Sequence, residues 1–491
     1  MDIEEAKKRA RSGPIMLFAR RIFSVVITLL STVTVARLIA PRDYGLASMA
    51  LVIFVLAQSF REFGLTNAIM RKGHVEQNEV SFLFWFNAGA TTVLSIILAV
   101  AARPISAFYK QPVVEFVVYA SIIGFFISGL SLQHRAVISR DLRFGSIALI
   151  DSVSQLIGFI TTLTLAFIRH DVWAIVIGGT VQSGVGSLLC VLVSKWQPDR
   201  YRTIPEWKEL LKFGGNSFVF TVCMFFADNS ASILIGHFIG PSPLGQYSRA
   251  QALYNLPNAN LVQPIVQSAM PLMARMRPHP QEYRSAYINL VRSLCTFLFP
   301  LSIALTFSAR PFVNTMLGDQ WDQAGVCFMM LAPSLAFFAL GYSAGDLFIT
   351  QNRAAELRSL GLLEAFVRVT SIVLGVQFGL VATALAFTIS NSVMAMWKVY
   401  VASRTGPVTL ADHVTAATPA IPLAVGAALG AVMIQIGTGF WVVPVPVVAF
   451  TQIGAAAISA LLVGLTFRSS RSALLAIISM IGLSRFVRRH V

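Results

Sequence analysis

Five charged residues stand inside long apolar stretches of this 491-residue chain, where an ionised side chain is costly unless a partner or water satisfies it. They are Arg61, Asp228, Asp346, Glu364 and Arg368. The planar guanidinium of an arginine can bind phosphate oxygens through paired donors, and a carboxylate can hold a cation or a proton. Glu364 and Arg368 are four residues apart, so on a helix they share a face and can pair. These residue types favour binding of an anionic ligand, coupling to an ion, or joining of helices.

Four further polar residues extend this set. Arg20, Arg21 and Arg249 lie close enough to the ends of apolar stretches that their long side chains either bind an anionic ligand or extend toward water. Asn229 directly follows Asp228. The candidates for ion coupling or for pairing between helical bundles are Asp228, Asn229, Asp346, Glu364 and Arg368.

No enzyme motif accompanies these residues. The chain has no GxxxxGK[ST] phosphate-binding loop, and its seven histidines are dispersed. Each of the four cysteines lies in a different apolar stretch, and they lack the spacing of a metal site or a disulfide framework: Cys190, Cys223, Cys295 and Cys327. We therefore expect no catalytic residue, no metal and no cofactor.

The composition predicts which kind of element positions the charged residues. Hydrophobic residues make up 56% of the chain and charged residues 12%, and the mean hydropathy is +0.71. Soluble domains carry about 25% charge. The apolar residues come in blocks of about 20, enough to cross a hydrocarbon core of ~30 Å as a helix, whereas the alternation of a membrane barrel is absent. The sequence thus predicts an all-α, polytopic membrane protein.

About fourteen apolar spans can be recognised. Their expected ranges are 14–36, 46–69, 80–102, 113–133, 147–168, 172–194, 213–238, 245–273, 286–308, 323–349, 356–376, 379–402, 415–436 and 443–466. On this assignment Arg61 lies ten residues before Arg71, about 15 Å into its span and near the bilayer midplane, while Glu62 faces elsewhere on the helix.

The basic residues predict the topology. The net charge of +16 gathers at the ends of spans rather than among aromatic residues, so it does not indicate nucleic-acid binding. With the N-terminus in the cytoplasm, most of the Lys and Arg residues fall on the cytoplasmic side. The opposite side receives only Arg37, Arg42, Arg103, Lys110, Arg169 and Arg310. Both termini are therefore expected in the cytoplasm.

An internal repeat accompanies the spans. The segment Ile39–Gly45 follows the first span and Ile239–Gly245 follows the seventh, with Ile, Pro and Gly recurring at a spacing of 200 residues. Pro and Gly stop one helix and let the chain reverse. The recurrence predicts two parallel six-helix lobes related by an axis along the membrane normal.

The expected organisation has five parts. Residues 1–194 form the first lobe, 195–212 an amphipathic cytoplasmic linker, and 213–405 the second lobe. Residues 406–467 add two transmembrane helices. Residues 468–491 mix apolar residues with five arginines and form an amphipathic tail that is attracted to anionic lipids.

Short motifs support a family resemblance over roughly residues 15 to 405. They are Ala36–Gly45, Phe63-Gly64-Leu65, Phe108-Tyr109 with Pro112, Arg140–Phe144, Asp228 with Ile235-Gly236, Leu244–Tyr247, and Leu317-Gly318 with Trp321. In these segments the chain resembles polysaccharide-exporting flippases of the multidrug/oligosaccharidyl-lipid/polysaccharide exporter superfamily, in the exopolysaccharide and lipopolysaccharide exporter branch.

The resemblance implies a specific activity. Such a protein has two six-helix lobes around a central cavity. By alternating access it moves an undecaprenyl-pyrophosphate-linked oligosaccharide from the cytoplasmic to the periplasmic leaflet of the bacterial inner membrane. Its expected partners are the lipid-linked oligosaccharide and the polymerase and export machinery of polysaccharide synthesis.

Two other functions are open to such a chain. A cation-coupled drug or small-molecule antiporter of the same superfamily needs acidic residues in its cavity, whereas the first span carries Arg20 and Arg21 and no acid after Pro14. A membrane-embedded glycosyltransferase or polymerase should carry sizeable polar loops with clustered acids, which this sequence lacks. An anionic cargo fits the arginines best.

The topology can be tested with cysteines placed singly next to Arg140 and Arg277. Both positions fall on the predicted cytoplasmic side. We expect an impermeant thiol reagent to leave both unlabelled in intact spheroplasts and to label both after lysis. Labelling of both in intact spheroplasts would contradict the topology.

Overall fold

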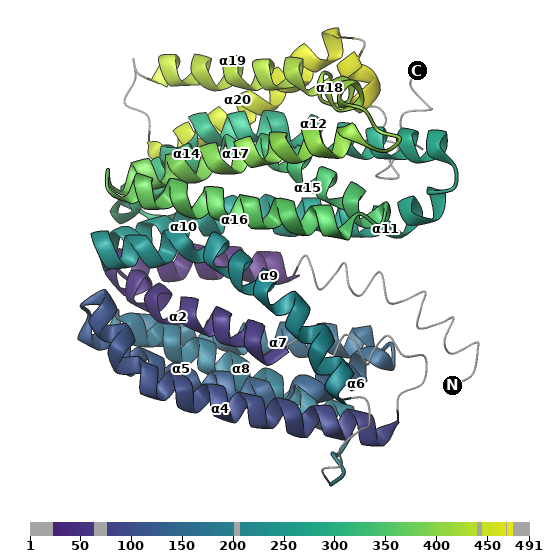
Figure 1. The fold of residues 1–491 in the computed structure, drawn as a ribbon. Helices are drawn as coiled ribbons and strands as arrows, with labels where there is room; N and C mark the ends of the chain where they lie inside the picture. The colour runs from purple at the N-terminus through teal and green to yellow at the C-terminus, as the bar shows by residue number, and fades with distance from the viewer. Residues whose placement is uncertain (1–22, 63–75, 201–206, 439–443, 468, 475–491) are drawn as a thin grey trace. The chain divides into compact units, whose positions relative to one another are not determined.

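The computed structural model describes residues 23–62, 76–200, 207–438, 444–467 and 469–474, and every regular element in these ranges is a helix (Figure 1). For Glu62 and for residues 207–219 it describes the backbone alone. Arg20, Arg21 and the predicted tail 475–491 lie outside the described residues. The chain divides into two compact units, Met1–Gly245 and Gln246–Val491.

The first unit is a bundle of long apolar helices. It begins with the helix Phe23–Leu38. The others are α2 (Pro41–Glu62), α4 (Gln77–Tyr109), α5 (Pro112–Leu130), α6 (Leu132–Arg140), α7 (Phe144–Arg169), α8 (Val172–Ser194), α9 (Trp207–Leu234) and the π-helical turn η1 (Ile235–Ile239). Proline begins α2 and α5, where its missing N–H leaves no bond unmade.

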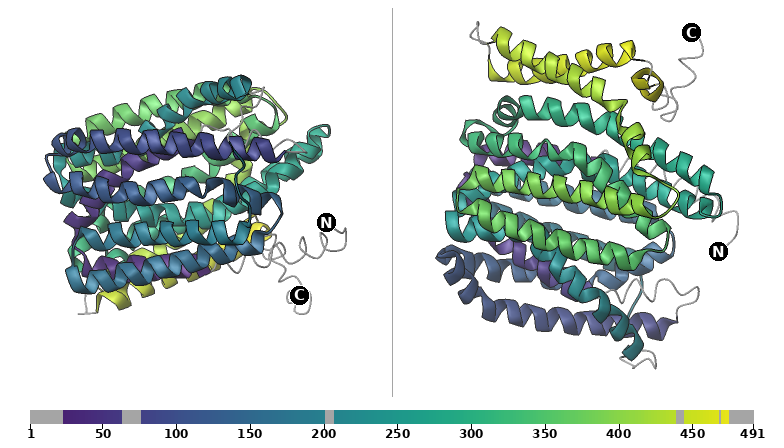
Figure 2. Two further views of the ribbon diagram at one scale, coloured as in Figure 1. Left: turned by 90° about the horizontal axis from the view of Figure 1, so that it is seen from below. Right: turned by 45° about the horizontal axis from the view of Figure 1, so that its top comes forward.

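The second unit contains more interruptions. Its elements are α10 (Pro241–Pro257), which begins in the first unit, η2 (Asn258–Val262), α11 (Gln263–Met276), α12 (Pro280–Phe307), α13 (Ala309–Leu317), η3 (Asp319–Trp321), α14 (Asp322–Leu331), α15 (Ser334–Thr350), α16 (Ala354–Val376), α17 (Leu380–Arg404), α18 (Leu410–Ala417), α19 (Ala420–Thr438) and α20 (Val445–Thr466). The last two helices pack side by side and against α12 (Figure 1 and Figure 2).

Each unit, taken by itself, joins its long helices in the same order. In the first unit α4 packs on α5, α5 on α8, and α8 on α7. In the second unit α12 packs on α15, α15 on α17, and α17 on α16. The repeated neighbour order agrees with the internal repeat of the sequence.

Part of the predicted linker packs against the first unit. The indole N–H of Trp196 donates to Oε1 of Gln77 at 2.8 Å, and the indole N–H of Trp85 donates to the carbonyl of Asp199 at 2.8 Å. These bonds hold residues 195–200 on the first turns of α4. The placement of the linker 195–212 at a domain boundary stays a prediction.

The number of spans is smaller than expected. The described residues contain 11 helices long and apolar enough to cross a membrane, or 12 if the pair Asp319–Leu331 and Ser334–Thr350, bent by 50°, is one span. The predicted span 14–36 lies partly outside the described residues. The predicted span 245–273 falls on α10, η2 and α11, which follow one another without a gap, and it is not among the apolar spans because α10 carries many polar residues, including Gln246, Arg249 and Asn255. The all-α membrane architecture is confirmed, but the number fourteen is not.

The two copies of the repeated turn contact each other within the first unit. Gly45 and Gly245 lie one turn after Pro41 and Pro241, which begin α2 and α10. A Cβ on Gly45 would lie 1.7 Å from the carbonyl oxygen of Pro241, and a Cβ on Gly245 would lie 1.8 Å from that of Pro41. The contact is reciprocal, and it requires glycine in both copies because any side chain would push the two helix starts apart.

Gly45→Ala and Gly245→Ala should each destabilise the protein. An exposed helix interior gains about 0.5–1 kcal/mol from Gly→Ala, but overpacking here should reverse the sign and cost about 1–3 kcal/mol. Gly89→Ala in α4 is the control, because no atom lies within 4 Å of its added Cβ. Thermal unfolding of the purified protein in detergent measures the difference. Equal unfolding temperatures for Gly45→Ala and Gly89→Ala would contradict the contact.

Candidate functional site

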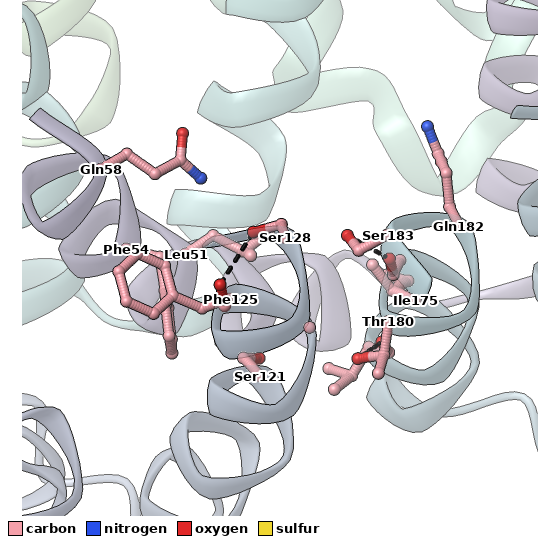
Figure 3. Close-up of a pocket in the computed structure, with 13 residues that line it drawn as sticks. Leu51, Phe54, Gln58, Ser121, Phe125, Ser128, Ile175, Thr180, Gln182 and Ser183 are labelled. Carbon is pink, nitrogen blue, oxygen red and sulfur yellow. Dashed lines mark hydrogen bonds between the residues drawn. The ribbon is translucent and has the colours of Figure 1, made fainter. Parts of the chain in front are cut away.

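A polar cavity lies inside the first unit, between α2, α5 and α8 (Figure 3). Its volume is about 360 Å³. The polar side chains that line it within the described residues are uncharged: Gln58 from α2, Ser121 and Ser128 from α5, and Thr180, Gln182 and Ser183 from α8. Phe54 and Phe125 supply aromatic surface, with ring centroids 5.8 Å apart. The cavity can therefore hold a ligand that has both polar and apolar groups.

The four hydroxyl groups of the lining bond to their own helices. The O–H of Ser121 donates to the carbonyl of Val117 at 2.8 Å, and that of Ser128 donates to the carbonyl of Phe125 at 2.8 Å. On α8, Thr180 and Ser183 bond in the same way at 2.9 and 3.0 Å. Such bonds let a hydroxyl sit in an apolar helix without an unpaired donor.

Arg61 adjoins this cavity from the last turn of α2. Its side chain is 6% exposed. Nη1 donates to the carbonyl of Phe125 at 3.2 Å and to Oγ of Ser128 at 3.0 Å, and the guanidinium carbon lies 4.9 Å from the centroid of the Phe125 ring. Both partners line the cavity, and Ser128 lies near the middle of the apolar span Pro112–Arg140. A permanent positive charge is thus held deep among the helices, next to a neutral polar cavity.

Asp228 and Asn229 occupy the seventh predicted span, in α9. The side chain of Asp228 is exposed, while Nδ2 of Asn229 donates to the carbonyl of Phe225, one turn earlier, at 2.9 Å. A pairing of Arg61 with Asp228 stays a prediction.

A second charged cluster lies in the second unit, where Glu364 holds two cations. Nη2 of Arg368 donates to Oε1 of Glu364 at 2.5 Å, and Nζ of Lys398 from α17 bonds the other carboxylate oxygen. Arg368 also donates to Oδ1 of Asn391 at 3.3 Å and lies 5.5 Å from the ring centroid of Phe387. Glu364 and Arg368 are 6% and 7% exposed. The pairing expected from their four-residue spacing is confirmed, and the cluster joins α16 to α17.

Asp346 lies in α15 and, unlike Glu364, forms no ion pair among the described residues. It is 6% exposed, and its Oδ2 has no hydrogen-bond partner among the described residues. One turn later the hydroxyl of Thr350 donates to the backbone carbonyl of Asp346 at 2.8 Å and contacts the hydroxyl of Tyr283 at 2.6 Å. Arg249 is half-buried in α10. Their roles in ion coupling or binding stay predictions.

Residues 34–325 match the family model described as polysaccharide biosynthesis protein, which is more than half of the chain. The chain belongs to this family. Members of the polysaccharide biosynthesis protein family therefore provide the comparison for the site just described.

Three similar bacterial proteins are named for the biosynthesis of lipopolysaccharide, teichuronic acid and succinoglycan. The chain is 22% identical over 376 residues to lipopolysaccharide biosynthesis protein WzxC of Escherichia coli, covering 76% of each chain. It is 25% identical over 302 residues to teichuronic acid biosynthesis protein TuaB of Bacillus subtilis, covering 61% of this chain and 62% of the relative. It is 23% identical over 302 residues to succinoglycan biosynthesis transport protein ExoT of Rhizobium meliloti, covering 61% of this chain and 60% of the relative.

Solved structures share the fold. Lipid II flippase MurJ, in an inward closed conformation, aligns with a TM-score of 0.73 and 13% identity, covering 92% of this chain and 97% of that chain. A multidrug resistance MATE family transporter of the MOP superfamily, in an inward-facing conformation, aligns with a TM-score of 0.61 and 13% identity, covering 77% and 93%. These likenesses confirm the superfamily fold.

Two motifs that carry the family resemblance meet at one end of the first unit. The imidazole of His237 stacks on Phe108 with ring centroids 4.2 Å apart, and its Nδ1 lies 2.8 Å from the carbonyl of Phe108. A Cβ on Gly236 would lie 2.8 Å from the ring of Tyr109. The motifs Phe108-Tyr109 and Ile235-Gly236 thus join α4 to η1, so they specify the family fold rather than a ligand.

The sequence carries a pattern from which the polar faces of the cavity could be predicted, and it places Lys398 near a membrane interface. Small and polar residues recur every three or four positions on α5 and on α8, which predicts a polar face on each helix: Ser121, Gly124 and Ser128, then Gly179, Thr180 and Ser183. Lys398 lies close to the end of the expected span 379–402, where a basic residue is typical of a membrane interface. The structure instead places its ammonium group on Glu364.

Removing Glu364 from the charged cluster should be strongly destabilising. Glu364→Ala leaves two largely buried cations without their carboxylate, which should cost about 3–5 kcal/mol. The triple replacement of Glu364, Arg368 and Lys398 by Met should recover most of this loss. Thermal unfolding in detergent measures both effects.

Glu356→Ala provides the matched control on the same helix. The side chain of Glu356 is 48% exposed and pairs with Arg353, so its loss should cost about 0–1 kcal/mol. If Glu364→Ala unfolds at the temperature of Glu356→Ala, Glu364 does not stabilise the second unit.

Proposed function

We propose that this protein is a flippase that moves an undecaprenyl-pyrophosphate-linked oligosaccharide across the bacterial inner membrane by alternating access. The observation that carries the proposal is the buried guanidinium of Arg61 beside a polar cavity of about 360 Å³. A lipid-linked oligosaccharide combines an anionic pyrophosphate with polar sugars. Family membership and the names of the relatives support the same class of cargo.

The charge of Arg61 suits the pyrophosphate. Its guanidinium presents planar, paired donors and stays ionised at any physiological pH, so it can exchange contacts with Phe125 and Ser128 for contacts with phosphate oxygens. Outward movement of each negative charge down an inside-negative potential gains ~2.3 kcal/mol per 100 mV. Flipping from the cytoplasmic to the periplasmic leaflet is therefore favoured by the membrane potential.

The proposal also covers the orientation of the protein in the membrane, its lipids and its partner proteins. Both termini lie in the cytoplasm, anionic lipids bind the basic tail, and the product passes to polymerase and export machinery for exopolysaccharide or lipopolysaccharide. A cation-coupled drug antiporter has less support, because the part of the first-unit cavity lining that the structure describes contains no carboxylate.

Deletion of the gene tests the proposal. The sugar-bearing undecaprenyl pyrophosphate should accumulate on the cytoplasmic leaflet, and the wild-type gene should restore export. Identification of the lipid by mass spectrometry after extraction checks the outcome. Absence of any lipid-linked oligosaccharide from the deletion strain would contradict the proposed cargo.

Substitution of Arg61 separates a role in cargo binding from a role in structure. Arg61→Ala should lower export more than tenfold, and Arg61→Lys should lower it about three- to tenfold because the charge remains but the paired donors are lost. Export is measured in cells that lack the native gene, with protein abundance measured by immunoblot.

Arg103→Ala is the control for loss of an arginine in the same unit, since Arg103 forms an ion pair with Glu115 and its side chain is 83% exposed. Arg61→Ala combined with Asp228→Ala should remain defective if Arg61 binds cargo. Recovery of export in that double variant would show that the two residues form a structural pair. Normal export by Arg61→Ala at normal abundance would exclude the cargo role.

A further inference from the structure

The polar groups of the first-unit cavity differ in what they can offer a ligand. The four hydroxyl groups have donated their hydrogens to backbone carbonyls of their own helices, so their remaining lone pairs act as acceptors. Gln58 and Gln182 stand on opposite sides of the cavity in the view of Figure 3. Their amides make no hydrogen bond within the described part of the chain, so each offers two N–H donors and one acceptor.

The absence of charge in the lining limits the class of ligand. No acidic or basic side chain is among the described residues that line the cavity. An isolated phosphate or uronate would therefore lack a cationic partner inside it, and a cationic drug would lack a carboxylate. Hydrocarbon also fits poorly, because lipid tails would leave the amides and hydroxyl lone pairs unsatisfied. The lining suits a neutral ligand rich in hydroxyl groups.

The volume of the cavity and its apolar lining also fit a neutral ligand rich in hydroxyl groups. A volume of about 360 Å³ lies at the low end of the range of roughly 300–1,000 Å³ for small-molecule sites, so it suits one or two sugar units rather than a whole oligosaccharide. Phe54 and Phe125 are buried and form an apolar edge of the cavity that the C–H groups of a pyranose can contact, while its hydroxyl groups donate to the acceptors on α5 and α8.

We infer that this cavity is a subsite for an uncharged sugar of the cargo, an inference that rests on the proposed flippase function. The subsite is continuous with Arg61, because Phe125 and Ser128 both line the cavity and bond the guanidinium. The charged and neutral parts of the cargo are thus bound by different residues of one unit. Arg61 binds the pyrophosphate, and the hydroxyls and amides select a neutral sugar over an acidic one.

The double variant Thr180→Val with Ser183→Ala tests the subsite. It removes two acceptors from the cavity and preserves side-chain volume closely. Two probes are titrated against the purified full-length protein in lipid nanodiscs: the lipid-linked oligosaccharide extracted from the deletion strain, and undecaprenyl pyrophosphate without sugar. Affinity for the first probe should fall about tenfold, as expected for two lost hydrogen bonds, and affinity for the second should change less than twofold.

The matched control is Thr161→Val with Ser59→Ala. Thr161 and Ser59 make the same kind of bond to their own helices, at 2.9 and 3.1 Å, but are not among the residues that line the cavity. This control should bind both probes as the wild type does. Gln58→Leu gives a second test that does not disturb a packed side chain, because Gln58 is exposed. It should weaken the sugar-bearing probe about threefold and leave the sugar-free probe unchanged.

The outcomes distinguish the two levels of the proposal. If the wild type binds the sugar-bearing probe and the cavity variants match the control, the sugar subsite is wrong while the flippase function stands. Equal losses for both probes would also overturn the subsite, since they would show a structural effect or phosphate binding. If the wild type binds neither probe, the flippase function and the subsite fall together.

Discussion

In the hydrocarbon region of a bilayer no water is present to satisfy a polar group, so the protein must provide each hydrogen bond itself. Many described polar groups meet this requirement in one of three ways, although Oδ2 of Asp346 has no hydrogen-bond partner among the described residues. Backbone groups are paired within helices, and the cavity hydroxyls donate to carbonyls of their own helix. Arg61 donates to a backbone carbonyl and a serine on α5. Because such partners must come from neighbouring helices, the intramembrane charges also determine which helices stay together.

Close approach of helices is the second requirement, and small residues make it possible. Lipid tails are as apolar as leucine, so helix association depends on packing rather than on exclusion of water. Gly45 and Gly245 allow the starts of α2 and α10 to touch through their backbones. Gly236 makes room for Tyr109 in the same unit. The motifs that identify the family are therefore largely the points where helices approach most closely, which explains why they indicate the fold better than the cargo.

Local spacing was enough to predict much of the fold and little of the site. Long apolar blocks predicted a helical membrane protein, and the four-residue spacing of Glu364 and Arg368 predicted their ion pair, because both depend on one helix alone. The partners of Arg61 lie 64 and 67 residues away on α5, and Lys398 reaches Glu364 from another helix. Such contacts depend on how helices rotate and cross, which one sequence does not specify. The polar residues of α10, among them Gln246, Arg249 and Asn255, are visible in the sequence and explain why 245–273 is not among the apolar spans.

The two units use their buried polar residues differently, and this difference bears on mechanism. In the second unit Glu364 is bonded by both Arg368 and Lys398, and Arg368 is bonded further by Asn391. Such a network is costly to open and suits a rigid element. The first unit instead keeps a neutral cavity whose amides make no hydrogen bond among the described residues, beside an arginine bonded to uncharged groups on α5. The described polar groups around the first-unit cavity can therefore bond a ligand without opening a charged network of this kind, whereas the cluster in the second unit holds α16 and α17 together.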